Sequence, residues 1–434
     1  MSSQPDVWRK ASAAIATVTA LAASSTGVEA GGFAVPEQSA VFQGSSFAGN
    51  AAGGALSSMF WNPAAVGQFD GINTESAYSL IIPETEVTAL PGSTLLFGGA
   101  PANGGNIAKD AVVPSSYVSY QLSRDLVFGL SINAPFGLTT EPENRFWAGQ
   151  TQARTSKIET YNFQPVLAYR IAPSLIVAAG LQIERFEATL KNATGGSPLS
   201  PNAVASAEDT ALGFTAGVLW QPTLATSVGL GFRSSIDHNL DGTLKVVGTP
   251  LGASIEAGIQ TPETVTLSLR QALTPQLTGL ASVEWSNWSR LKSLDIVCTS
   301  VQPALGCFTP GSTARSLALG WHDGWFVSAG LEYAMNPALT LRTGVAWEQS
   351  PIQDPDERTV RLPDADRIWA SIGASYRWSR NITLDVAYSH IFVDDATIDR
   401  TESGVRLVAD ANSQIDILSV GLRIKLGDEP TPLK

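Results

Sequence analysis

The chain is most constrained by runs of strictly alternating residues that recur between short turns from about Asn73 onward. The four clearest runs cover residues 325–333, 339–348, 368–378 and 418–426, and in each of them one face is mainly apolar. The opposite face carries small and charged residues. Alternation of this length predicts β-strands that cross a bilayer, because a membrane strand needs ~9–11 residues.

Short turns and long connections alternate along this region. Six tight turns carry Pro, Asn or charged residues, and they lie at 121–125, 171–174, 221–225, 272–276, 335–338 and 378–381. One run without a turn partner remains at each end, at about 73–82 and 414–426, so about fourteen strands are expected. The connections between hairpins are long, at 83–114, 138–153, 191–209, 241–259, 294–320, 350–364 and 394–412. This asymmetry predicts an all-β fold, a transmembrane antiparallel barrel in a bacterial outer membrane.

Composition agrees with a barrel better than with the alternatives. Only 15% of residues are charged, and the net charge of −12 argues against nucleic acid as a partner. Outside the N-terminus no uninterrupted apolar stretch reaches the ~18 residues of a membrane helix. A soluble β-sandwich also alternates, but its strands usually have about five or six residues. Six aromatic residues fit the two interfacial girdles of a membrane barrel, namely Trp220, Tyr333, Trp347, Tyr376, Trp378 and Tyr388.

The first thirty residues have the pattern of an export signal. Arg9 and Lys10 precede an apolar run at 11–23, and Val28-Glu29-Ala30 is a small-x-small cleavage site. A single membrane-anchoring helix is the alternative, although the apolar run is short for one. We therefore expect four parts along the chain: a signal peptide at 1–30, an N-terminal hatch at 31–72, the barrel at 73–427 and a C-terminal tail at 428–434.

The stretch 31–71 is rich in Gly, Ala and Ser and cannot build a core of its own. Its only ionisable groups are Glu37 and Asp70. Near its end, Asn62 as N-cap and Pro63 at the first helical position predict one short helical turn. A barrel of fourteen strands encloses more space than its own side chains fill. We therefore expect this stretch to plug the lumen.

No catalytic constellation is visible, and the chain is not expected to be an enzyme. An outer membrane lipase or protease would need a nucleophile beside a histidine, and the three histidines lie far apart in sequence without such a context. No cofactor or metal site is expected. In an exported protein Cys298 and Cys307 predict a disulfide across a short loop.

One run contains an irregularity that bears on function. In 126–138 the alternation meets Asn133-Ala134-Pro135-Phe136-Gly137. Proline cannot donate to a sheet ladder, and a nearby glycine permits a bulge or a bend. The strand could simply end here. The other interpretation is a kink that opens the barrel wall sideways, from the lumen into lipid.

Two groups of stretches carry a family resemblance. In the N-terminal region they are Gly32, Glu37-Gln38, Gly44, Ala48-Gly49 and Asn62-Pro63-Ala64. In the barrel they are NAPFGLT at 133–139, VEWSNWS at 283–289, 341–347 followed by Ser350-Pro351, and LPDADRIW at 362–369. Together they resemble the FadL-type transporters of long-chain fatty acids.

This resemblance implies a monomeric barrel of fourteen strands with its N-terminus as a hatch in the lumen. Hydrophobic ligands would be captured among the outer loops, bind beside the hatch and leave sideways into outer membrane lipid. The kink would then comprise Asn133, Pro135, Phe136 and Gly137. The hatch motif would be Asn62-Pro63-Ala64, and Phe33 would lie near the deep ligand site and move when ligand binds.

The charged residues that meet a fatty carboxylate do not follow clearly from the resemblance. Lys191, Arg315 and His322 are the candidates. The chain also departs from the family pattern because it does not end on an aromatic residue and its loops are less basic. An importer of aromatic hydrocarbons with the same fold is therefore an alternative, as are a structural barrel and an ion-conducting porin.

Overall fold

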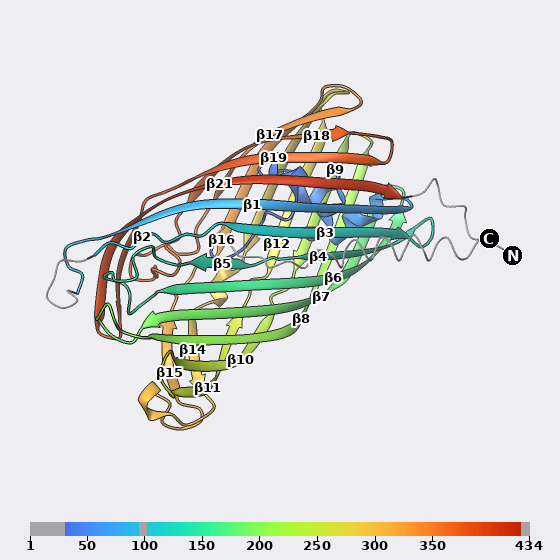
Figure 1. The fold of residues 1–434 in the computed structure, drawn as a ribbon. Helices are drawn as coiled ribbons and strands as arrows, with labels where there is room; N and C mark the ends of the chain where they lie inside the picture. Colours follow the sequence, from blue (N-terminus) through green and yellow to red (C-terminus); the bar gives the residue numbers. More distant parts are fainter. Residues whose placement is uncertain (1–30, 95–101, 427–434) are drawn as a thin grey trace.

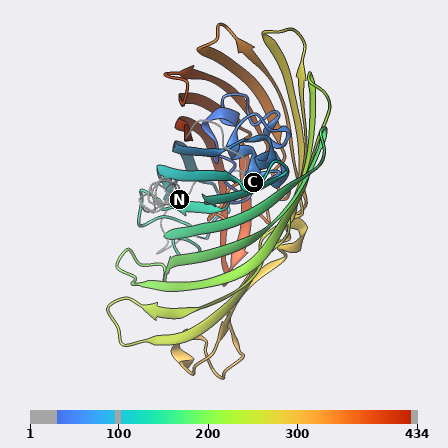
Figure 2. The same ribbon diagram turned by 90° about the vertical axis from the view of Figure 1, so that its right-hand side faces the viewer.

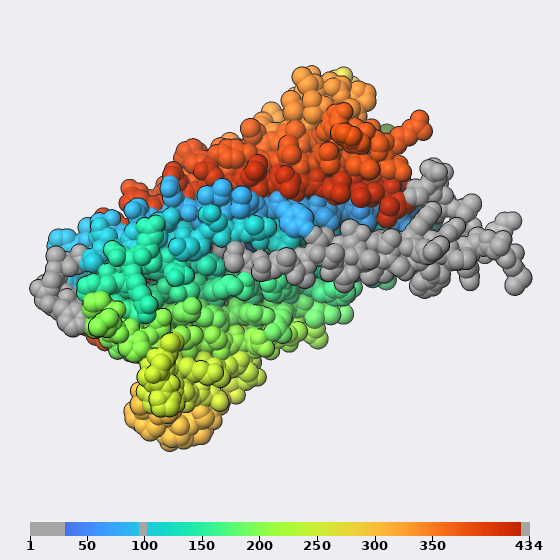
Figure 3. Space-filling model, viewed as in Figure 1, coloured from blue at the N-terminus to red at the C-terminus, as the bar shows by residue number. Residues whose placement is uncertain are grey.

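The computed structural model describes residues 31–94 and 102–426, in which the strands form one closed antiparallel barrel (Figure 1). The barrel closes where β1 pairs with β21, from Ile72 opposite Leu426 to Ala89 opposite Ala409. In the space-filling view β1, in blue, lies directly against β21, in red (Figure 3). The predicted signal peptide and C-terminal tail lie outside the described residues. The last strand of the barrel ends at Leu426.

The barrel has fourteen strand lines, as the sequence predicted, and seven of these lines are each made of two successive strands. The two-strand lines are β2–β3, β4–β5, β9–β10, β11–β12, β13–β14, β15–β16 and β19–β20. The strand bounds are β1 Ile72–Ala89, β2 Gly105–Asn106, β3 Ala111–Gln121, β4 Leu126–Asn133, β5 Gly137–Thr140, β6 Thr155–Ala172, β7 Leu175–Ala193, β8 Asn202–Thr223, β9 Thr226–Arg233, β10 Asp237–Val246, β11 Gly252–Gln260, β12 Thr264–Ala272, β13 Leu277–Ser286, β14 Ser293–Cys298, β15 Thr313–Ala318, β16 Gly324–Ala334, β17 Leu339–Glu348, β18 Arg367–Arg377, β19 Ile382–Val393, β20 Ala396–Glu402 and β21 Val405–Leu426.

All six predicted tight turns join neighbouring strands at one end of the barrel, which we call the turn end. Most of the predicted long connections, in contrast, include residues that belong to strands in the structure. The stretch predicted as a connection at 241–259 is mostly the hairpin of β10 and β11, and Lys245 lies opposite Gly252. Likewise β7 and β8 pair as far as Ala193 and Asn202. Backbone pairing therefore continues beyond the runs from which the strands were predicted.

Four strand lines break at one level of the wall and continue as a lobe. The breaks lie at 234–236, 261–263, 287–292 and 319–323. Beyond them, β10, β11, β14 and β15 form the lobe, which projects from the rest of the molecule (Figures 1 and 3). Within the lobe Cys298 and Cys307 form a disulfide.

The outer face of the barrel carries the apolar alternation. The six aromatic residues assigned to the girdles are all exposed on this face, and so are many aliphatic side chains such as Leu212 and Ile372. No helix among the described residues is long and apolar enough to cross a membrane. The helices are all short: α2 Ala40–Gln43, η1 Asn50–Ala52, η2 Leu56–Phe60, η3 Pro63–Gln68, η5 Trp288–Arg290 and η6 Pro303–Leu305.

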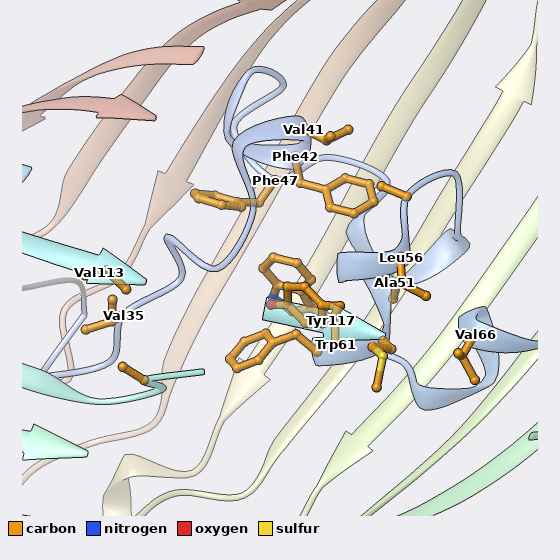
Figure 4. Close-up of a cluster of buried hydrophobic side chains, with 14 of the residues drawn as sticks. Val35, Val41, Phe42, Phe47, Ala51, Leu56, Trp61, Val66, Val113 and Tyr117 are labelled. Carbon is orange, nitrogen blue, oxygen red and sulfur yellow. The ribbon is translucent and has the colours of Figure 1, made fainter. Parts of the chain in front are cut away.

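Residues 31–71, which we call the N-terminal segment, lie inside the barrel and are almost entirely buried (Figure 2). We distinguish a leading part, 31–38, from an anchored part, 40–68. The predicted helical turn forms as the 3₁₀-helix η3, in which the Asn62 side chain accepts a hydrogen bond from the Ala64 amide. The anchored part packs around the Trp61 ring, whose centroid lies 5.7 Å from that of Phe42 and 5.8 Å from that of Phe47 (Figure 4).

Small residues on the inner face of the barrel explain why the anchored part fits. A Cβ added to Gly229 would lie 1.8 Å from the Ala51 carbonyl oxygen, and one added to Gly344 would lie 2.1 Å from that of Ser45. Inward serines supply hydrogen bonds at the same places. Ser282 accepts from the Gly49 amide at 2.8 Å, for example. The inner face is thus shaped to the backbone of the N-terminal segment.

Candidate functional site

The wall of the barrel is interrupted between β3 and the line of β4 and β5. The β3–β4 ladder ends at Ser116 opposite Ile132, although β3 continues to Ala111 along β1. On the other side the line keeps its partner, because β6 pairs with both β4 and β5. Residues 134–136 belong to neither strand. We call the stretch between β3 residues 111–115 and residues 133–137 the β3 gap.

The leading part occupies the position that β3 leaves vacant. The Val35 amide donates to the Pro135 carbonyl at 2.8 Å, and the Gly137 amide donates to the Phe33 carbonyl at 2.9 Å. Ala34 and Phe136 form an isolated antiparallel bridge. The backbone that turns away from β3 is therefore paired with the N-terminal segment, and the gap is filled in this structure.

Gln38 completes this seal. Its side-chain amide donates to the Ala134 carbonyl at 2.8 Å, and its side-chain carbonyl accepts from the Ala134 amide at 3.3 Å. From the β3 side, Ser115 and Tyr117 both donate to the Gln38 backbone carbonyl, at 2.9 and 2.8 Å. Sequence reasoning quoted Gln38 only within the family resemblance. The available signal was an uncharged side chain that offers both a donor and an acceptor, as a strand backbone does.

Aromatic side chains meet above the leading part. The Phe33 ring lies 4.8 Å from that of Trp288, 5.7 Å from those of Phe136 and Trp321, and 6.3 Å from that of Phe186. Phe33 is buried, with 3% of its surface exposed. This places the predicted Phe33 against the predicted kink residue Phe136.

Below this aromatic cluster lies an inner cavity of about 80 Å³, bounded by the leading part and by the kink. Its charged lining residues are Glu184, Glu284, Glu348 and Arg233. Arg233 is held by the Phe60 carbonyl at 3.1 Å and the Gln164 side chain at 2.7 Å. The volume is well below the ~300–1,000 Å³ of ordinary ligand sites, so this cavity is too small for a large ligand in the structure.

A larger cavity of about 540 Å³ lies between the lobe and the ends of β7 and β8. We call it the lobe cavity. Its walls are mostly apolar, with Leu244, Ile296 and Leu317 among them, and its two charged lining residues are Arg315 and Arg361. This combination suits an apolar molecule that carries one anionic group.

The two arginines differ in their surroundings. Arg315 pairs with Glu402 at 2.7 Å and stays partly exposed. Arg361 is buried and donates to the Thr155 carbonyl at 3.1 Å, while its Nε has no hydrogen-bond partner among the described residues. Burial lowers the pKa of Arg361 to about 9, so the guanidinium remains protonated at neutral pH. Sequence reasoning missed Arg361, because nothing in its local pattern separates it from other loop arginines.

The remaining predicted residues lie elsewhere. Lys191 does not line the lobe cavity, although its neighbours Leu190 and Asn192 do. His322 lies 3.6 Å from Glu357 at the surface, and with Asp354 these residues place one possible metal-ligand atom each within 4.8 Å of one another. Such exposed groups are common without a metal ion.

The predicted hatch motif lies against the wall rather than around a cavity. The Asn62 side chain donates to the Ala51 carbonyl at 2.8 Å and to the Val218 carbonyl of β8 at 2.9 Å. Among the lining residues of the inner cavity, the nearest to this motif in sequence is Trp61. The motif therefore fastens the anchored part, whereas Phe33 belongs to the leading part.

Comparisons with known proteins agree with this architecture. The family model described as outer membrane protein transport protein (OMPP1/FadL/TodX) matches residues 21–425. The long-chain fatty acid transport protein of Escherichia coli O6:H1 is 26% identical over 430 residues, covering 90% of this chain and 92% of that protein. Outer membrane protein P1 of Haemophilus influenzae is 25% identical over 421 residues, covering 86% and 88%.

Solved structures show the same fold. The crystal structure of a Pseudomonas aeruginosa FadL homologue superposes with a TM-score of 0.81 at 23% identity, covering 92% of this chain and 100% of that one. The Ralstonia pickettii toluene transporter TbuX superposes with a TM-score of 0.62 at 18% identity, covering 88% and 98%.

Proposed function

This chain belongs to the OMPP1/FadL/TodX family of outer membrane transport proteins, and we propose that it takes up long-chain fatty acids or similar hydrophobic molecules through the β3 gap. The ligand is captured in the lobe cavity, passes the aromatic cluster to the inner cavity and leaves sideways into lipid. The N-terminal segment acts as the hatch. Family membership makes the chain a transporter; the route and the ligand are our proposal.

The β3 gap is the observation that carries this route. An apolar solute gains little from a watery channel and gains free energy on entering hydrocarbon, so a sideways path suits it. In a closed barrel such a path needs wall residues that are not tied to their neighbouring strand. Residues 133–137 meet this requirement because their partner on the β3 side is the leading part, not β3.

The small inner cavity supports a gate role for the leading part. At about 80 Å³ it holds no fatty acid until the leading part moves. Phe33 packs against both Trp288 and Phe136, two residues that line the cavity, so its departure enlarges the cavity and frees the kink at once. Asn62, Pro63 and Ala64 keep the anchored part in place during this movement.

The lobe cavity favours an acid as the ligand. Two arginines in a site that is otherwise mostly apolar offer a carboxylate charge-assisted hydrogen bonds, which a neutral hydrocarbon cannot use. The second candidate is a neutral aromatic hydrocarbon. The aromatic cluster and the three carboxylates of the inner cavity favour that ligand, since an anion would be repelled there.

Uptake of labelled oleate and of labelled toluene separates these candidates, in cells that lack their own transporter. We expect oleate to accumulate faster. Replacing Pro135 and Gly137 by valine should abolish uptake while the barrel still inserts, because valine favours a continuous strand. Gly258→Val is the matched control, since a Cβ there meets nothing within 4 Å. Unchanged uptake by a correctly inserted double variant would refute the sideways route.

A further inference from the structure

The LPDADRIW motif at 362–369 has no role in the route just described, yet it contacts the start of the leading part. The Gly31 nitrogen donates to Oε1 of Glu348 at 2.6 Å. The Gly32 nitrogen donates to Oδ2 of Asp364, within the motif, at 3.0 Å. The backbone nitrogens of the first two residues of the leading part thus each donate a hydrogen bond to a carboxylate.

Both carboxylates are built into the protein interior. The Trp369 indole donates to Oε2 of Glu348 at 2.9 Å, and the Ser350 hydroxyl donates to Oδ2 of Asp364 at 2.7 Å. Glu348 and Asp364 are 7% and 1% exposed. Because each carboxylate accepts this second hydrogen bond, its position does not depend on Gly31.

Negative charge exceeds positive charge around this position. Arg367 pairs with Asp364 and lies 3.8 Å from Glu348. Two buried carboxylates, those of Glu348 and Asp364, therefore share one guanidinium, and buried carboxylates without a countercharge are costly.

The structure leaves little space for a side chain at position 31 or position 32, and glycine occupies both. A Cβ on Gly31 would lie 2.7 Å from Oε1 of Glu348. Gly32 has a φ of +68°, and a Cβ there would lie 3.0 Å from Trp288 and 3.1 Å from Trp321. The close fit fixes the Gly31 nitrogen beside the carboxylate and places the next residue, Phe33, in the aromatic cluster.

We propose that the Ala30–Gly31 peptide bond is hydrolysed during export and that the resulting α-ammonium group of Gly31 forms an ion pair with Glu348, supported by Asp364. Water supplies the hydroxyl of the new Ala30 carboxyl group and a proton to the Gly31 nitrogen, which takes up a second proton at neutral pH. This ion pair latches the leading part. Its effect on ligand passage rests on the proposed function, whereas the ion pair itself does not.

An ammonium group answers the charge excess in a way that an amide cannot. It adds one positive charge and three donors where an amide offers one neutral donor. Hydrogen bonds between charged groups are about twice as strong as neutral ones. The motif then has a concrete role, because Asp364, Arg367 and Trp369 together hold the carboxylates that receive the new N-terminus.

The test is amine labelling of the purified full-length protein at neutral pH, with the N-terminal peptide identified by mass spectrometry. The N-terminal peptide should begin at Gly31. Its α-amine should react about tenfold more slowly than that of the Glu348→Gln/Asp364→Asn variant, because the variant loses a charged hydrogen bond. Glu187→Gln is the control and should label as the wild type does, because the exposed Glu187 side chain pairs with Arg185 and not with the leading part. A different N-terminus, or a wild-type amine as reactive as the variant's, would overturn the proposal.

A second variant covers the case in which the double variant fails to fold. One serine inserted between Ala30 and Gly31 leaves every barrel residue unchanged but moves the ammonium group away from Glu348. Its amine should label faster than that of the wild type, and equal protection would again overturn the proposal. Uptake is measured on the same proteins: if the wild type transports neither oleate nor toluene, the proposed function fails while the labelling result stands.

Discussion

The leading part and the anchored part of the N-terminal segment lie in the same barrel but are held by different means. The anchored part touches inward glycines at backbone distance and packs its rings into a continuous apolar core (Figure 4). The leading part is held by one short bridge at the kink, by Gln38, and by two glycine nitrogens on carboxylates. Its two larger buried apolar side chains are Phe33 and Val35, and Val35 joins the apolar core of the anchored part.

This difference between the two parts shows how a gate can be built without a hinge domain. Backbone-to-backbone fit tolerates no shift, because packed interiors resist even small changes in volume. Hydrogen bonds to a few polar groups can be exchanged one at a time, and each contributes only about 1 kcal/mol net. One end of the segment is therefore fixed while the other can be displaced by a ligand.

The largest effect is expected from Gly229→Val, which attacks the anchored part. The Ala51 carbonyl oxygen lies 1.8 Å from the new Cβ, so the cost exceeds the ~3 kcal/mol of ordinary overpacking. The anchored part should leave the wall, and single-channel recordings in planar bilayers should show sustained currents that the wild type lacks. Gly258→Val should stay as closed as the wild type. Large currents through the wild type would instead favour a porin.

A smaller and more local effect is expected from Gln38→Leu, which attacks the leading part. The Ala134 amide and carbonyl lose their partner, at a cost of about 2 kcal/mol, or an about 30-fold faster local opening. Hydrogen exchange of residues 133–137 in detergent should rise by that factor, with exchange in the anchored part unchanged. Unaltered exchange at 133–137 would show that Gln38 does not seal the gap.

The smallest effect is expected from Ser282→Ala, the matching deletion in the anchored part. Its hydroxyl accepts from the Gly49 amide and bonds the Asn50 side chain at 3.0 Å, but the glycine fit around it remains. About 1 kcal/mol should be lost, with an about fivefold faster exchange near Gly49 and normal uptake. A loss of uptake comparable to that of a leading-part variant would erase the distinction between the two parts.

The fold was predictable because membrane strands show a regular alternation of apolar and polar residues between short turns. The turns at 121–125 and 335–338, for instance, stand between strands just as predicted. The strand extensions at β10 and β11 were harder to predict, because charged residues such as Asp241, Lys245 and Glu256 interrupt the apolar pattern there.

The site was predictable only where a single residue type carries the signal. Pro135 and Gly137 stand out in any strand, so the place of the interruption could be read from the sequence. The role of Gln38 depends on Ala134, which lies 96 positions away, and the roles of Glu348 and Arg361 also depend on partners far apart in the chain. Candidates chosen by charge alone therefore brought Arg315 to a cavity but not Lys191 or His322.

Oleate uptake by an Ala34→Cys/Phe136→Cys variant, in which the new cysteines lie at bridge partners suited to a disulfide, tests the central claim most directly. A control pair at Ala281→Cys/Ala329→Cys lies in the unbroken wall and accounts for reduction of the native Cys298–Cys307 bond. Our account predicts that the oxidised variant takes up no oleate, that reductant restores uptake, and that the control transports in both states. Equal uptake by the variant before and after reduction, with its new disulfide verified by mass spectrometry, would contradict the account.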